Sequence, residues 1–599
     1  MHRKRLTERT LLLSLLFAAF LLGHSPLASA TGRGDGIASE APGSAMLEQE
    51  QRAPRRVGKL DVRTYDRLQR LRAGDKVRVG IWLTSPPLDP ELIERPQAML
   101  TAIEMEGITK RRTQVLAAAY RAHSKRLVSL IESKRGKVNL VSRLAPLAYA
   151  EVRARDLQDL QARAEVDTIY LEGLTGAPDL DTMVKVHKAD VLWGPSANVV
   201  GSQARACVIE PDGVAANNPY LRVEGYYATP NPGKHATFVA GIIQSIWNPD
   251  RFFRRDLRGH AWGALPILSG NSGDYTETNL VGATEWCVAQ GASVVNHSYT
   301  VDKTRNPVGL DRYLDHVVRY HRVLQVKSAG NEGPNPATVT SPGKGYNVLT
   351  VGSIDDRDTF TSWMDDRISG YSSYIDPYAP GTGGVIGKPE VVAVGCHSSS
   401  RPIRSTTDRS PWTGTSGCGT SYAAPAVVGT ALLMQQRNPE LKVWPEATKA
   451  IIMATAIQNI EGSRVFSDKD GAGRIRSDLA VDWAGKVMGD SPQVKYTEFN
   501  PSTYGTQDEL TFSRPLNGRL RCTLVWDADS AGIDHQTNLD LRVVRASTGT
   551  VIASSTSLSN AFEIVDVDVP ATDTYKVRVS VTRANNETSN YMGLACYVP

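Results

Sequence analysis

The stretch Gly419-Thr420-Ser421-Tyr422-Ala423-Ala424-Pro425 leads from a glycine into an apolar run that continues through Leu432, Leu433 and Met434. Small and apolar residues over this length predict a buried helix with Ser421 at its N-terminus. Free backbone N–H groups and the positive end of the helix dipole favour developing negative charge there. Ser421 is therefore a candidate nucleophile, with a plain helix-capping serine as the alternative interpretation. Ser416 stands in a second Gly-Thr-Ser, but no helical pattern follows it.

The residues on either side of this stretch alternate between strand-like and helical patterns from about Ala204 to Ala480. Such alternation predicts an α/β fold in which a parallel sheet carries helices on both faces. In these folds the functional side chains lie at the carboxyl ends of strands. The strand-like runs are Ala206 to Ile209, Ala292 to Asn296, Arg322 to Lys327 and Asn347 to Val351.

His235 and Asn331 provide two further groups that acyl-transfer chemistry needs. His235 opens a run of small and apolar residues that permits close helix packing, so its imidazole is placed to act as a general base. Asn331 directly follows a predicted strand, where its amide can donate a hydrogen bond to an oxyanion. Taken singly, a histidine is more often a structural side chain and an asparagine beside glycine is more often a turn.

The order of these three stretches is similar to that in the subtilisin-like serine peptidases, the subtilase family, whose triad runs Asp, His, Ser along the chain. The resemblance extends from residue 59 to about 485, and Gly-Thr-Ser-x-Ala-Ala-Pro is its most specific part. It implies an inhibitory propeptide, a cleft flanked by Trp286 to Val288 and Val294 to Ser298, and two substrate-binding edges. The implied edge residues are Ser298, Tyr299, Thr300, Ser328, Ala329 and Gly330, with Tyr299 and Thr300 in place of the family's usual Leu-Gly.

The triad acid is where the sequence departs most from the family pattern. The family's strand ends Val-Ile-Asp-x-Gly, whereas this strand reads Cys207-Val208-Ile209-Glu210-Pro211-Asp212-Gly213. If the strand is aligned with the family's strand without a gap, Glu210 takes the position of the triad acid. If the triad acid must be an aspartate, as in the family, Asp212 takes that position and one residue is inserted before it. The register favours Glu210, because a glutamate needs only a small retreat of the backbone to reach a histidine nitrogen. A surface acid at the strand end is the remaining interpretation of Glu210.

The N-terminus has the pattern of a secretory signal. A basic start precedes the apolar stretch Leu11 to Leu22, and Ala28-Ser29-Ala30 is a small-residue cleavage site. The apolar stretch is shorter than the roughly 20 residues that a membrane-spanning helix needs. We therefore expect a signal peptide over residues 1–30, and a protein that is secreted, either extracellular or periplasmic.

Composition and periodicity divide the rest of the chain into four parts. Residues 31–58 are rich in Gly, Ala, Ser and charge without periodicity, which predicts a disordered leader. Residues 59–176 show a β-α-β-β-α-β order typical of a small α+β domain, which the resemblance makes propeptide-like. Residues 177–487 carry the α/β pattern, and residues 488–599 alternate apolar and polar residues at period two, which predicts an antiparallel β-sandwich.

The cysteines predict disulfides, because the chain has an even number of them in an exported protein. Cys522 and Cys596 bracket one β-rich segment, and Cys396 and Cys418 flank one loop, so we expect these two pairs. For the remaining two, Cys207 and Cys287, a third disulfide and two buried free thiols are both open.

The combined hypothesis is a serine endopeptidase in which His235 takes the proton of Ser421 and Ser421 attacks a peptide carbonyl. Asn331 and the Ser421 N–H stabilise the oxyanion, and Glu210 or Asp212 orients the imidazole. We expect protein or peptide substrates, the chain's own propeptide as an intramolecular inhibitor, and a monomer. An inactive homologue that serves as a binding or scaffold protein is the alternative. An esterase of the α/β-hydrolase type fits less well, because its histidine follows the serine.

Composition also predicts whether the chain binds nucleic acid, a membrane or a metal ion. The formal net charge is +5, with basic residues gathered in the extreme N-terminus, so the chain lacks the pattern of a nucleic-acid-binding face. We expect no nucleic acid, no membrane contact after signal cleavage, and no cofactor or metal for the chemistry. Asp527, Asp534 and Asp540 are candidate ligands of a structural calcium ion, with solvated loop acids as the alternative.

Overall fold

The computed structural model describes residues 56–598 with gaps, of which the longest are residues 87–101, 173–183, 247–256 and 376–385. The predicted signal peptide and residues 31–55 of the predicted disordered leader lie outside the described residues. Arg56–Val57 (β1) pairs with Leu60–Asp61 (β2), so the described structure begins within the last three residues of that predicted leader. Among the described helices, none is long and apolar enough to cross a membrane.

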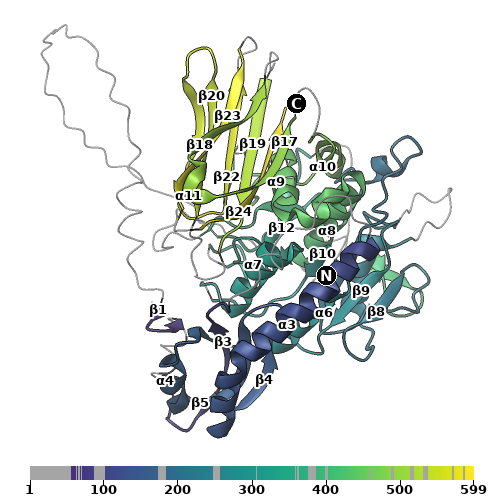
Figure 1. Ribbon diagram of the computed structural model, residues 1–599. Coiled ribbons are helices and arrows are strands. Elements are labelled where there is room, and N and C mark those ends of the chain that lie inside the picture. The colour runs from purple at the N-terminus through teal and green to yellow at the C-terminus, as the bar shows by residue number, and fades with distance from the viewer. Residues whose placement is uncertain are drawn as a thin grey trace, which may run out of the picture. The chain divides into compact units, whose positions relative to one another are not determined.

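An eight-stranded sheet forms the centre of the peptidase segment (Figure 1). Its strands are β7 (Ala206–Glu210), β8 (Val223–Tyr226), β9 (Ile267–Asn271), β10 (Val294–His297), β11 (Leu324–Ser328), β12 (Leu349–Asp355), β13 (Arg367–Ile368) and β14 (Val391–Cys396). The order is β13-β12-β11-β10-β7-β9-β8, with β14 paired to β12. Every pairing is parallel except that of β12 with β13. Parallel strands place their carboxyl ends along one edge.

Helices cover both faces of this sheet because its strands are apolar on both sides. In β7, Ala206 and Val208 belong to the core cluster of α5 (Lys234–Gln244) and α8 (Thr420–Arg437). The alternate residues, Cys207 and Ile209, belong to the cluster of α6 (Glu277–Ala289) and α7 (Gly309–His321). The predicted α/β class, a parallel sheet with helices on both faces, is confirmed. Helices α9 (Pro445–Thr455) and α10 (Ser477–Ala484) extend the first cluster.

A separate sheet precedes the peptidase segment, and we call residues 56–172 the leader domain. Its order is β1-β2-β6-β3-β5-β4. Leu127 and Ile131 of the long helix α3 pack on this sheet because apolar residues recur along one side of the helix. The elements not yet given are β3 (Lys76–Leu83), α3 (Ala102–Ser133), β4 (Lys137–Val141), β5 (Leu147–Arg153), α4 (Leu157–Gln161) and β6 (Val166–Leu171).

Two four-stranded antiparallel sheets form the C-terminal sandwich, which we define as residues 494–597. Leu539, Leu541 and Val543 point into its core together with Val577 and Val579, as their period-two spacing predicts. The sheets are β17-β24-β19-β22 and β18-β23-β20-β21. Their strands are β17 (Val494–Phe499), β18 (Thr506–Phe512), β19 (Gly518–Trp526), β20 (Asn538–Arg545), β21 (Val551–Ser555), β22 (Phe562–Val569), β23 (Tyr575–Arg583) and β24 (Asn590–Tyr597), with the short helix α11 (Pro501–Tyr504) after β17.

The six cysteines form three disulfides, none of which joins two of the three parts just described. The two expected pairs, Cys396–Cys418 and Cys522–Cys596, are confirmed. Cys207 and Cys287 form the third disulfide, so the free-thiol alternative is wrong. This third bond connects the strand that ends at Glu210 to helix α6.

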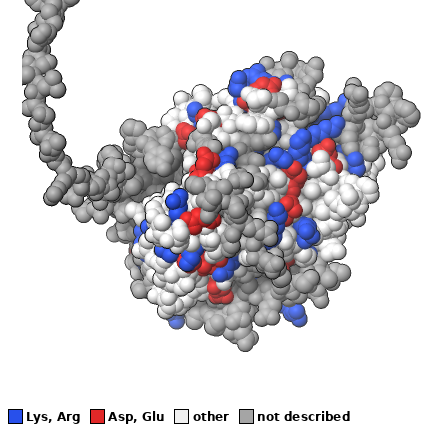
Figure 2. All heavy atoms as spheres, turned by 90° about the horizontal axis from the view of Figure 1, so that it is seen from above, with Lys and Arg blue, Asp and Glu red and all other residues white. Residues whose placement is uncertain are grey.

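On the face that Figure 2 presents, charged side chains of both signs are interspersed. Figure 2 shows Lys and Arg side chains next to Asp and Glu on the face that it presents, with no broad area of one sign. An interspersed surface of this kind produces little net field toward a charged partner.

Two buried histidines form a chain of hydrogen bonds between the start of the peptidase segment and its core. The Val394 N–H donates to His187 Nε2 at 3.0 Å, so His187 carries its proton on Nδ1, which lies 2.9 Å from His260 Nε2. The Nδ1–H of His260 in turn points to the carbonyl of Ile242 at 3.3 Å. Both rings are therefore neutral. Burial lowers the pKa of His187 well below its usual value and lowers the pKa of His260 to about 4.

Acidification is therefore expected to destabilise the fold through this pair. The unfolded chain takes up a proton at each imidazole near pH 6.5, whereas folded His260 does so only at about pH 4. The contribution of His260 to the free energy of unfolding is complete above pH 6.5, and about 3 kcal/mol of it is lost by pH 4. In a Ser421→Ala background that prevents self-cleavage, His260→Gln should lose less stability between pH 7 and pH 4 than its parent, as measured by chemical denaturation. Equal losses in the two chains would contradict this role of His260.

Candidate active site

The four residues of the predicted catalytic group lie at strand ends and helix starts along one edge of the sheet. Glu210 is the last residue of β7, and Asn331 follows β11. His235 is the second residue of α5, and Ser421 is the second residue of α8. Because β7, β10 and β11 are parallel neighbours, the loops that follow them meet at the same edge.

Glu210 and His235 form a close acid–imidazole pair. Glu210 Oε2 lies 3.1 Å from His235 Nδ1, with the Glu210 side chain fully buried and 15% of the His235 side chain exposed. Burial raises the pKa of the Glu210 carboxyl, and the neighbouring imidazole opposes that rise because its positive charge stabilises the carboxylate. A carboxylate at Nδ1 keeps the proton on that nitrogen, which makes Nε2 the nitrogen that accepts a proton.

Asp212, the alternative acid, lies against the turn that precedes α5. Its carboxyl fills the space beside Gly233, where an added Cβ would come within 2.3 Å of Asp212 Oδ2. Asp212 is half-buried, while Glu210 is completely enclosed. The carboxylate that the structure brings to His235 Nδ1 is that of Glu210.

Ser421 lies where the helix α8 meets the end of β10. Its Oγ donates a hydrogen bond to the carbonyl of Ser298 at 3.2 Å, and Ser298 Oγ donates to the carbonyl of Ser421 at 3.1 Å. The rings of Phe238 on α5 and Tyr422 on α8 are 6.3 Å apart, so the two helices pack next to their histidine and serine. The rival Ser416 lies after β16 (Thr413–Thr415), outside α8, with its Oγ 3.0 Å from the Tyr422 hydroxyl.

Thr420, which sequence reasoning missed, fixes the orientation of Asn331. The Asn331 Oδ1 accepts hydrogen bonds from the Thr420 N–H at 2.9 Å and from Thr420 Oγ1 at 3.0 Å. Thr420 Oγ1 in turn accepts from the Gly330 N–H at 3.1 Å. With the amide oxygen used in this way, the amide NH2 is the end of Asn331 that can donate to a substrate oxygen. The signal for this role was a hydroxyl side chain at the first position of the predicted helix.

The two predicted substrate-binding edges, Ser298 to Thr300 and Ser328 to Gly330, lie at the ends of the neighbouring strands β10 and β11. The Tyr299 side chain is buried, and its hydroxyl lies 2.7 Å from His297 Nδ1, so its ring faces the core and not the edge. Thr340 connects the edges: it receives a hydrogen bond from Thr300 Oγ1 at 3.1 Å and its N–H donates to Ala329 O at 2.9 Å. Only the backbone of Tyr299 remains for contact with a peptide.

Two of the three candidate calcium ligands lie beside arginine side chains. Asp540 pairs with Arg542 at 2.7 Å, and the buried Asp527 lies 3.5 Å from Arg322. Asp534 lies outside the described residues. Within the described part of the chain there is no group of three or more His, Cys, Asp or Glu that could hold a metal ion. Asp527 and Asp540 are buried, so the alternative of solvated loop acids is wrong for these two.

The leader domain contacts the peptidase segment at helix α6. Glu172, at the end of β6, accepts hydrogen bonds from the Thr278 N–H at 3.0 Å and from Thr278 Oγ1 at 2.7 Å, and it pairs with Arg78 at 2.9 Å. Tyr149 donates to Glu277 at 3.0 Å, and burial raises the pKa of Tyr149 well above its usual value. A carboxylate at the first turn of a helix is favoured by the exposed N–H groups there.

The described fold and this edge of the sheet together define an α/β protein with a buried carboxylate, an imidazole and a helix-terminal hydroxyl, which is the arrangement of a serine hydrolase. Residues 184–480 match the family model described as "Subtilase family". The chain is similar to the serine protease AprX of Bacillus subtilis, at 29% identity over 274 residues, which is 41% of this chain and 57% of AprX. It is also similar to an alkaline protease of Alkalihalobacillus alcalophilus, at 24% identity over 46% of this chain and 67% of that protein. Residues 184–480 thus belong to the subtilase family, and the chain carries a subtilisin-like peptidase domain.

One solved structure is similar over more of the chain. Fervidolysin from Fervidobacterium pennivorans, titled a keratinolytic enzyme related to subtilisin, aligns over 85% of this chain and 71% of that chain, with 17% identity and a TM-score of 0.46. The chain spans about half of the length of AprX.

Proposed function

We propose that the chain is a secreted serine endopeptidase that hydrolyses peptide bonds of protein substrates through an acyl-enzyme. Ser421 is the nucleophile, His235 is the general base and acid, and Glu210 orients the imidazole. Asn331 and the Ser421 N–H stabilise the oxyanion. The observation that carries the proposal is the 3.1 Å contact between the buried Glu210 carboxylate and His235 Nδ1, within a chain segment of the subtilase family.

In the first step, His235 Nε2 accepts the Ser421 hydroxyl proton while Ser421 Oγ bonds to the peptide carbonyl carbon. The negative charge that forms on the carbonyl oxygen is stabilised at the start of α8, where backbone N–H groups and the Asn331 amide converge. His235 then gives its proton to the leaving amine, and a water repeats the sequence to release the acid. Glu210 stays ionised throughout and stabilises the imidazolium.

The leader domain acts, in this proposal, as an intramolecular inhibitor that is removed when the peptidase segment cleaves itself. Two features favour it. The last described leader residue, Glu172, is held at the start of α6, and the described peptidase segment resumes at Val184. The connection between these two residues therefore begins beside the helix that flanks the proposed cleft.

The test is covalent labelling with a fluorophosphonate probe, which reacts with an activated serine. We expect the purified chain to be labelled at Ser421 after its leader is removed, and the Ser421→Ala variant to remain unlabelled. Ser416→Ala serves as the matched control, because it removes a serine from the same Gly-Thr-Ser context and should be labelled like the parent. A parent chain without Ser421-dependent labelling would favour the inactive, scaffold-type homologue instead.

A further inference from the structure

Helix α7 contacts two different parts of the chain through two neighbouring rows of side chains. The first row is Arg312, His316 and Tyr320, spaced four residues apart, and we call it the leader row. The second row is Asp315 and Arg319, four residues apart on α7, together with Arg322, which directly follows the helix with a left-handed backbone (φ 61°), and we call it the sandwich row. Residues four apart lie above one another on a helix, so the leader row and the pair of Asp315 and Arg319 each follow one side of α7.

The leader row holds the leader domain. Arg312 Nη1 donates to Asp167 Oδ2 at 2.9 Å, and its guanidinium lies over the Trp82 ring, 4.2 Å from the ring centre. The His316 ring meets the edge of the same Trp82 ring at a centroid distance of 5.7 Å. Tyr320 interacts electrostatically with Tyr120 of α3. Arg312 and His316 are each only 5% exposed, so the leader domain encloses this row.

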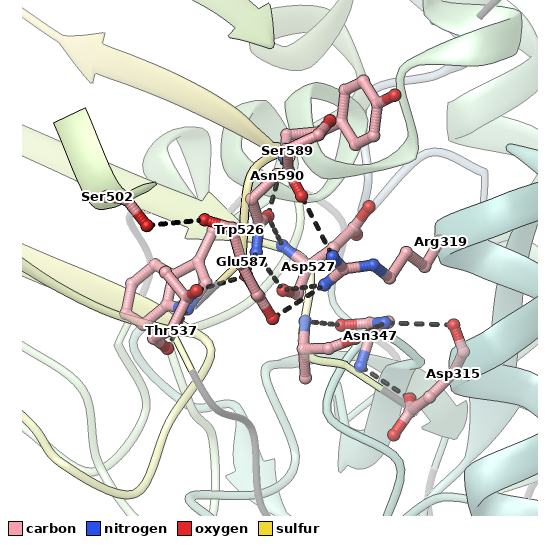
Figure 3. Close-up of polar contacts among 12 residues, drawn as sticks. Asp315, Arg319, Asn347, Ser502, Trp526, Asp527, Thr537, Glu587, Ser589 and Asn590 are labelled. Carbon is pink, nitrogen blue, oxygen red and sulfur yellow. Dashed lines mark hydrogen bonds and ion pairs between the residues drawn. The ribbon is translucent and has the colours of Figure 1, made fainter. Parts of the chain in front are cut away.

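The sandwich row holds the C-terminal sandwich (Figure 3). Arg319 donates to the carbonyls of Asp527 at 3.2 Å and Ser589 at 3.1 Å, and pairs with Glu587 at 3.5 Å. Arg322 pairs with Asp527 and lies over the Tyr591 ring, 3.7 Å from its centre.

Asn347 adds a bridge from the same row to the sandwich. It donates to the main-chain carbonyls of Asp315 at 3.0 Å and Ala528 at 3.1 Å, and accepts from the Ala528 N–H at 2.7 Å. Figure 3 shows Asp315 and Arg319 on the same side of their helix, with Asn347 and Asp527 facing them.

The arginines of the sandwich row depend on the sandwich for their acceptors. Arg319 is 5% exposed and Arg322 is 2% exposed, so neither guanidinium can exchange its protein partners for water without movement. A buried donor or charge that loses its partner costs about 1 to 3 kcal/mol or more. A loosened sandwich would therefore shift α7, and a rigid helix that shifts carries its leader row with it.

The last residue of α7, His321, also contacts the leader domain. His321 Nε2 lies 2.7 Å from the carbonyl of Leu144 in the leader domain. The end of α7 is thus a place where the leader domain, the peptidase segment and the C-terminal sandwich come together.

We propose that the C-terminal sandwich forms part of the binding surface for the leader domain by holding helix α7, so that leader binding and sandwich docking strengthen each other. This assigns the sandwich a role in retaining the leader rather than in binding substrate. The proposal rests on contacts within the chain and not on peptidase activity, so it holds or fails independently of the proposed function. Coupling through one rigid element is reciprocal in binding free energy.

The test measures hydrogen–deuterium exchange in the full chain, with Ser421→Ala present so that the leader stays attached. Asp527→Asn combined with Glu587→Gln removes the two carboxylates that face Arg322 and Arg319. We expect amides of β3 and β6 in the leader domain to exchange at least about 5-fold faster, the lower end of typical coupling energies. The matched control is Asp508→Asn, which removes a paired sandwich carboxylate on β18. It should leave the leader amides within about twofold of the parent.

Faster exchange in the sandwich and α7 with an unchanged leader domain would overturn the proposal and leave the sandwich as a stabilising cap. If the double variant exchanges faster throughout the whole chain, general destabilisation could also explain the result. A variant on the leader side of α7 then tests the coupling in the opposite direction. Arg312→Met removes the contacts to Asp167 and Trp82 while keeping an apolar side chain. It should accelerate exchange of residues Glu587 to Tyr591 by at least about 5-fold. If amide exchange of these sandwich residues does not change, the leader domain and the sandwich are not coupled through α7.

Discussion

Replacement of Glu210 by glutamine is expected to lower kcat by about 10⁴-fold while KM changes little. The glutamine amide cannot stabilise the imidazolium that His235 becomes, and it no longer selects the tautomer with the proton on Nδ1. Because burial raises the pKa of Glu210, a neutral amide of the same shape should not weaken the fold. The kinetics are measured with a peptide substrate, and thermal unfolding confirms that the loss is catalytic.

Two further variants separate Glu210 from its alternatives. Asp212→Asn should retain activity within about threefold, because the Asp212 carboxyl lies against Gly233 and Glu210 is the acid at His235 Nδ1. Glu210→Asp keeps the charge but withdraws it by about 1.5 Å, the length of one carbon–carbon bond. It should fall between the parent and Glu210→Gln. If Asp212→Asn were the inactive variant and Glu210→Gln the active one, the assignment of the acid would be wrong.

Loss of the Asn331 amide is the second large effect, and Asn331→Ala should lower kcat by about 100 to 1000-fold. The oxyanion exists only in the transition state, so removing a donor to it should affect kcat and leave KM almost unchanged. Asn335→Ala is the matched control, since Asn335 lies exposed on the same loop. A rise in KM with an unchanged kcat would show that Asn331 binds substrate and does not stabilise the oxyanion.

Thr420 supplies a finer test of the same site, as a positioning residue. Thr420→Val removes the hydroxyl that connects the Gly330 N–H to Asn331 Oδ1 but leaves the shape of the side chain. The Asn331 amide would then lose one of its two anchors. We expect kcat to fall by about 10-fold with KM unchanged, which is less than for Asn331→Ala, and Thr420→Ser should restore most of the rate.

The sheet and the sandwich were predictable because their periodicity is strong. Apolar runs in β7 and β10 and period-two alternation in β20 and β23 are typical of buried and half-buried strands. The short strand β1 was missed, since two residues carry too little pattern to separate a strand from a disordered tail.

At the site, the residues that follow from local pattern could be named from the sequence, whereas those that depend on tertiary contact were left with alternatives open. Ser421 and His235 each open an apolar helix, which is visible in the sequence. The choice between Glu210 and Asp212 depends on where the strand β7 ends relative to α5, and a sequence does not contain that distance. The Cys207–Cys287 bond is of the same kind, because its partners are 80 residues apart and meet only when α6 packs on β7.

Tyr299 shows that a residue at the predicted edge can turn its side chain into the core. The residue follows β10, and its side chain belongs to the core cluster of α6 and α7. Its hydroxyl lies 2.7 Å from Nδ1 of the buried His297, two residues earlier.

The hydrogen bond between Ser421 Oγ and the Ser298 carbonyl has a consequence for how catalysis begins. A serine hydroxyl has one proton, so while it is given to Ser298 it is not available to His235. An extended peptide that pairs with the Ser298 edge would compete for the same carbonyl through its own N–H. Binding of a substrate would then release the Ser421 hydroxyl, which could turn toward the imidazole. Without a bound peptide strand, the hydroxyl would stay bonded to the Ser298 carbonyl and would not be activated by His235.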